Sequence, residues 1–109
     1  MATVSIGALH RRNFDGQAYE AVTVAGTSKA LTAGTYSTRR YALITVETAP
    51  IRFTLDGTPP VAATTGHLVY AGDQIELDSN EDITSFRAIR ETATSATLQV
   101  TYSELKLTS

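Results

Sequence analysis

The sequence lacks several residue types that carry common chemistry. Its 109 residues include no cysteine, no tryptophan, two histidines and three prolines. The absence of cysteine excludes disulfides, thiolate catalysis and cysteine-ligated metal sites, and it leaves the redox compartment open. Because tryptophan and paired cysteines are both missing, the chain does not match an antibody-type immunoglobulin domain.

The sequence also lacks a large excess of acidic or basic residues. Nine Lys and Arg residues against eleven Asp and Glu residues leave a net charge of −2, so there is no electrostatic reason to expect a nucleic-acid or membrane partner. The first residues lack the basic start and apolar run of a signal peptide, and no segment approaches the ~20 apolar residues of a membrane span. We therefore expect synthesis and folding in a cytoplasm.

The sequence does contain many short segments in which apolar and polar residues alternate. In the central stretch, Ile51, Phe53 and Leu55 alternate with polar residues, which predicts a half-buried strand. Asp56-Gly57 and Pro59-Pro60 then force a turn, because Gly tolerates positive φ and Pro lacks a backbone donor. Further strands are predicted at 19–25, 29–32, 41–49, 68–70, 75–77, 85–90 and 96–103.

Three of the other predictions are more specific. The 41–49 segment has apolar residues on both faces near its start, which predicts a central strand. Ser79 or Asn80 is expected to cap a single helical turn. Within 85–90 the apolar residues do not share one parity, which indicates either a bulge or a strand with both faces partly covered.

Seven or eight short strands, roughly 8–12 residues apart and with no helix-period segment, predict an all-β fold. We expect an antiparallel two-sheet β-sandwich, jelly-roll or immunoglobulin-like in its connections. The expected organisation is an N-terminal arm at 1–17, a sandwich domain at 18–103 and a C-terminal tail at 104–109. The arm is either a frayed terminus or short strand, or a segment that becomes ordered on a partner. Leu105 and Leu107 continue the apolar alternation on the opposite parity, so the tail either follows a bulge or meets another chain.

We predict no catalytic, cofactor or metal site. His67 could meet Asp56 or Asp73 across a hairpin, but no nucleophile motif accompanies them. The acidic segment 78–82 suggests a calcium loop, yet Ile83 and the residue at position 89 stand where such a loop needs Gly and Glu. A solvated acidic turn is the expected structure there.

The arginines and tyrosines are the other candidate binding residues. The arginines at 39, 40, 52, 87 and 90 lie in or beside strands, where Glu76, Asp78 and Glu91 are available as partners. Four aromatic residues, Tyr41, Phe53, Phe86 and Tyr102, are expected in the core. The remaining tyrosines, Tyr19, Tyr36 and Tyr70, are weak candidates for stacking on a sugar.

Four runs of the sequence carry a resemblance to known proteins. They are Tyr41-Ala42-Leu43-Ile44-Thr45-Val46-Glu47-Thr48-Ala49-Pro50-Ile51-Arg52-Phe53-Thr54-Leu55-Asp56-Gly57-Thr58-Pro59-Pro60, Thr65-Gly66-His67-Leu68, Tyr70-Ala71-Gly72-Asp73 and Phe86-Arg87-Ala88-Ile89-Arg90. With them, about residues 18–103 resemble small all-β structural proteins of tailed bacteriophages, a group that includes head decoration (cement) proteins.

The resemblance implies a non-enzymatic virion component that is made in the bacterial cytoplasm, has no cofactor and acts by binding. As a cement protein it would sit on the head surface as a dimer or trimer and bind the major capsid protein or another virion protein. The expected contact residues lie in the arm and tail: Val4, Ile6, Leu9, Arg11, Arg12, Leu105 and Leu107. Two alternatives stay open, namely a tail- or fibre-associated module that recognises a host-surface glycan, and a neck or tail adaptor.

Overall fold

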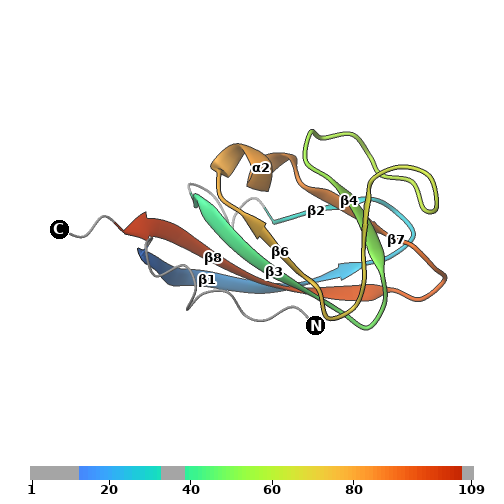
Figure 1. The fold of residues 1–109 in the computed structure, drawn as a ribbon, viewed down its shortest axis with the longest axis horizontal. Coiled ribbons are helices and arrows are strands. Elements are labelled where there is room, and N and C mark those ends of the chain that lie inside the picture. The colour runs from blue at the N-terminus through green and yellow to red at the C-terminus, as the bar shows by residue number, and fades with distance from the viewer. Residues whose placement is uncertain (1–12, 33–38, 107–109) are drawn as a thin grey trace.

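The computed structural model describes residues 13–32 and 39–106, and it describes side chains over 18–32 and 39–103. This part of the chain contains eight strands and one short helix (Figure 1). The elements are β1 (Asn13–Val24), β2 (Lys29–Ala30), β3 (Tyr41–Glu47), β4 (Ile51–Thr54), β5 (His67–Val69), β6 (Gln74–Leu77), α2 (Asn80–Ser85), β7 (Arg87–Arg90) and β8 (Ala96–Lys106).

The strands form two four-stranded antiparallel sheets, which confirms the predicted β-sandwich. The strand orders are β1-β8-β3-β6 and β2-β7-β4-β5. The antiparallel pairs β1–β8, β2–β7, β3–β6 and β4–β5 are nested one inside the other, as in a long hairpin that has been rolled into two sheets. This nesting is the eight-stranded jelly roll, so the topology selects the jelly-roll form of the predicted sandwich.

The core lies between the two sheets and follows the predicted alternation. In β8, Leu98 and Val100 point inward and are fully buried, and they pack with Ile44 and Val46 of β3. Each fully buried side chain of this kind stabilises the fold by roughly 1.5–3 kcal/mol. The aromatic residues expected in the core are buried, and the rings of Phe53 and Phe86 stack with centroids 5.6 Å apart.

Strand β3 is central, as predicted, because it lies between β8 and β6. Tyr41 and Leu43 point away from the core that lies between the sheets, yet both are buried. The apolar residues on both faces of this segment therefore reflect burial on both faces.

The single helical turn expected near Ser79 is present as α2. Ser79 is its N-cap, and its hydroxyl oxygen accepts a hydrogen bond from the backbone N–H of Asp82 at 3.1 Å. Ile83 anchors the helix in the core with no exposed surface. The acidic segment thus forms the capped helical turn, and its Asp78 and Glu81 are exposed to solvent.

The strand limits differ from the prediction at both ends of the sheet. Strand β1 begins at Asn13, and β8 continues to Lys106, so the sheet extends beyond the predicted limits of 18 and 103. The register shifts between Gly16 and Ala18 of β1, opposite Ser103 and Tyr102, so the irregularity lies in β1 just before the tail begins. Strand β7 pairs with β4 in unbroken register, and Arg87, Ile89 and Arg90 are half-buried, so of the two alternatives the strand with both faces partly covered is confirmed.

Candidate functional site

The first candidate site is the end of the β1–β8 strand pair. Asn13 lies opposite Lys106, and the pairing continues with Phe14 opposite Leu105. Because the strands are antiparallel, the segment that precedes Asn13 and the segment that follows Lys106 join the sheet at the same place (Figure 1). The topology thus brings together the starting points of the predicted arm and tail.

Most of the predicted contact residues lie outside the described part of the chain. Leu105 is the exception, because its backbone belongs to β8. Arg12 directly precedes the first residue of β1, and Leu107 directly follows the last residue of β8. The residues outside the description are Val4, Ile6, Leu9, Arg11, Arg12 and Leu107.

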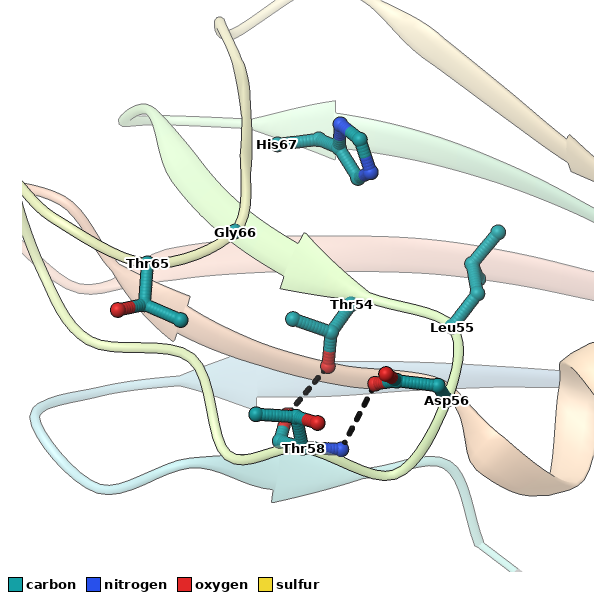
Figure 2. Close-up of a pocket in the computed structure, with 7 residues that line it drawn as sticks. All are labelled: Thr54, Leu55, Asp56, Thr58, Thr65, Gly66 and His67. Carbon is teal, nitrogen blue, oxygen red and sulfur yellow. Dashed lines mark hydrogen bonds between the residues drawn. The ribbon is translucent and has the colours of Figure 1, made fainter.

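The second candidate site is a hollow of about 510 Å³ where the β4–β5 connection meets both strands. Figure 2 shows its lining side chains arranged around Thr54, with His67 and Leu55 on one side and Asp56 with Thr58 on another. The seven lining residues are Thr54, Leu55, Asp56, Thr58, Thr65, Gly66 and His67.

A tight turn forms one wall of this hollow. The Asp56 carboxylate accepts a hydrogen bond from the Thr58 N–H at 3.0 Å, and the Thr54 hydroxyl donates to the Thr58 carbonyl oxygen (Figure 2). The Gly57 N–H donates to the carbonyl oxygen of Ser85 at 3.1 Å, which joins the turn to the end of α2. The hydrogen bonds from Thr58 lower the pKa of Asp56 below its ordinary value, so this carboxylate is ionised at neutral pH.

The contact with Asp56 or Asp73 that a catalytic His67 would need does not occur in the described structure. Asp73 accepts a hydrogen bond from the Tyr70 N–H at 2.8 Å and closes the β5–β6 turn, while Asp56 closes its own turn. The exposed His67 instead places its ring 5.4 Å from that of Phe53. His67 therefore lines the hollow without an orienting carboxylate.

An ion pair fixes the far part of the β4–β5 connection. Arg52 Nε lies 2.7 Å from Glu91 Oε1, and Arg52 Nη1 donates to the Gly66 carbonyl oxygen at 2.9 Å. The Ala63 N–H also donates to Glu91 Oε1, at 2.8 Å. The Arg52 guanidinium, followed by the Ala63 N–H, lowers the pKa of Glu91. Glu91 was among the predicted partners of the arginines, and here it ties the loop to the sheet.

The sugar-stacking candidates do not form one platform. Tyr19 is 62% exposed on β1, where its hydroxyl donates to Gln99, and Tyr70 is 59% exposed in the β5–β6 turn. Tyr19 lies on β1, and Tyr70 lies in the turn that leads into β6; β1 and β6 are the opposite edges of one sheet, so the two rings are on opposite sides of that sheet's width. Tyr36 lies outside the described residues.

The pairing of the hollow's residues was not predicted from sequence. The sequence predicts the turn at Asp56-Gly57, but it does not indicate Thr54, Thr58 and Thr65 as site residues. The sequence signal for part of the site is the spacing of Asp56 and Thr58, because an aspartate often accepts a hydrogen bond from the N–H two residues ahead. The position of His67 beside Phe53 depends on the β4–β5 register.

Among the side chains that the structure describes, over 18–32 and 39–103, no group of three from His, Asp and Glu is placed to hold a metal ion. None of the helices described there has the length and apolar character needed to cross a membrane.

Comparison with known proteins gives no relative for this chain. No protein-family model, no curated protein and no solved structure matches it. The fold assignment therefore rests on strand order and register, and any function rests on the two candidate sites and on the sequence.

Proposed function

We propose that the chain is a non-enzymatic structural protein of a tailed-bacteriophage virion, and that it decorates and stabilises the expanded head as a homo-oligomer. The observation that carries the proposal is the register of β1 and β8, in which Asn13 faces Lys106. The two segments with the predicted contact residues start side by side there, so both can reach one partner surface. The sequence resemblance to phage structural proteins supplies the identity of that partner, the major capsid protein.

The proposed mechanism is thermodynamic linkage. A protein that binds only the expanded shell stabilises that state by RT ln(1 + [L]/Kd), which is about 2.7 kcal/mol at a hundredfold excess over Kd. Many copies on one shell, each with two contact segments, add avidity to this effect. In this scheme the jelly roll is a rigid support for the terminal segments.

Co-sedimentation with phage heads tests the proposal. Purified protein is mixed with expanded heads that lack it, and with tails and host cells as parallel baits. Saturable binding to heads at hundreds of copies is the expected result, and deletion of residues 2–12 should abolish it. Binding to tails or cells alone would discard the head assignment in favour of the adaptor or the glycan-recognition module.

A further inference from the structure

The hollow at the β4–β5 connection has the dimensions of a small-ligand site. Its volume of about 510 Å³ lies within the range of roughly 300–1,000 Å³ that is typical of ligand pockets. Thr54 forms its floor and is only 9% exposed, whereas Asp56, Thr58 and His67 are exposed around it. The hollow is thus open to solvent.

The walls of the hollow are fixed before any ligand arrives. One wall is held by the Asp56–Thr58 and Thr54–Thr58 hydrogen bonds and by the Gly57–Ser85 bond to α2. The other wall begins at Gly66, whose carbonyl oxygen accepts from Arg52. A preformed site loses little conformational entropy on binding, which favours affinity for a small molecule.

The chemistry of the lining selects a class of ligand. The lining holds one carboxylate, three threonines and no lysine or arginine. Asp56 uses one oxygen for the Thr58 N–H, and a carboxylate has about four acceptor positions, so it can accept further hydrogen bonds from ligand hydroxyls. An anionic ligand would meet the Asp56 charge, and no lysine or arginine lines the hollow to offset it.

The hollow also offers apolar surface beside these acceptors. Leu55 packs against the core while it lines the hollow, and the exposed His67 ring is supported by Phe53 behind it. Sugars carry hydroxyls around the ring and apolar C–H groups on its faces. We propose that this hollow binds a neutral sugar unit, with hydroxyls donating to Asp56 and a C–H face against Leu55 and His67.

Titration of the full chain with sugars, followed by ¹H–¹⁵N NMR, tests this proposal. The probes are D-glucose, D-galactose, D-mannose and N-acetyl-D-glucosamine, each to about 50 mM, because one open site of this kind implies millimolar affinity. At least one probe should give saturable shifts confined to the amides of 54–58 and 65–67. N-acetylneuraminic acid, which is anionic, should bind at least about tenfold more weakly, because it meets the Asp56 charge.

Matched variants separate binding from folding. Asp56→Asn keeps an acceptor for the Thr58 N–H but removes the charge, so we expect about tenfold weaker binding with the fold intact. The control is Asp73→Asn, which makes the same change in the other aspartate-closed turn and should bind like the natural chain. The proposal is overturned if no neutral probe shifts these amides, if the anionic sugar binds equally well, or if Asp56→Asn has no effect. Head binding is measured with a different bait, so either proposal can fail without the other.

Discussion

At the scale of single residues, Gly66 allows β5 to start directly beside β4. Its φ is +115°, and a Cβ atom there would lie 3.0 Å from the Phe53 carbonyl oxygen and 3.2 Å from the Arg52 Cβ. We expect Gly66→Ala to lower the free energy of unfolding by about 2–4 kcal/mol, because it adds backbone strain and a steric clash. Urea denaturation measures this loss.

Gly57 provides the matched control for this substitution. Its φ is +85°, but a Cβ there would meet no atom within 4 Å. Gly57→Ala should therefore cost only the backbone term, about 1–2 kcal/mol. If the two variants lose the same stability, the close approach of Gly66 to β4 is not a significant constraint.

Glu91 makes stability depend on pH through its contacts with Arg52 and Ala63. Its pKa in the folded state lies below the ordinary 4.5, so the folded protein binds fewer protons than the unfolded chain in this range. The stabilisation that the ionised Glu91 provides is complete above the ordinary pKa of 4.5 and is lost as the pH falls through the folded pKa. Between about pH 5 and pH 3, the Tm of Glu91→Gln should therefore fall less steeply than that of the natural chain.

The control for this measurement removes a carboxylate of the same type. Glu76 is exposed on β6, and Glu76→Gln should keep the steep dependence of Tm on pH. Equal slopes for Glu91→Gln and the natural chain would show that the ion pair with Arg52 does not contribute to acid sensitivity.

At the scale of elements, the short helix α2 depends on its cap. Ser79 has extended backbone angles and accepts from the Asp82 N–H, which satisfies one of the free donors at the helix start. Ser79→Ala should lower the free energy of unfolding by about 0.5–2 kcal/mol, while Ser79→Asp should stay close to the natural value. Urea denaturation distinguishes them, and equal losses in both variants would contradict a capping role.

The sequence predicts some elements better than others, for reasons that particular residues show. Strand β8 and the cap at Ser79 were predictable because alternation and capping are local signals. The start of β1 was not, because Asp15-Gly16 resembles a turn, whereas the structure incorporates Gly16 into the strand beside a register shift. A bulge residue and a turn residue have the same local preferences, and only the partner strand decides between them.

The hollow shows the same division between local and long-range information. The turn at Asp56 follows from its own sequence, but Thr65 and His67 reach the site only because His67 pairs with Phe53. Hydrophobic alternation identifies the face of a strand without identifying its neighbour. The set of residues that line the hollow therefore follows only from the β4–β5 register, which local sequence signals do not give.

At the scale of the whole molecule, the jelly roll closes by pairing its first and last strands. The pairing runs from Val24 opposite Ala96 to Asn13 opposite Lys106, so it lies within one sheet over the full length of both strands. The stability of the fold and the starting point of the proposed contact segments are thus properties of the same strand pair.

A truncation series separates these two properties. Deletion of residues 2–17 removes the four pairs from Asn13 opposite Lys106 to Gly16 opposite Ser103, whereas deletion of 2–12 keeps them. With about four hydrogen bonds in this part of the ladder, at about 0.5–1.5 kcal/mol each, the longer deletion should be about 2–6 kcal/mol less stable than the shorter one in urea. Equal stabilities would mean that this end of the ladder does not support the sheet. The same two variants also locate the head contact. If deletion of residues 2–12 alone abolishes head binding, the contact lies in the segment before β1, because the β1–β8 pair is still intact in that variant.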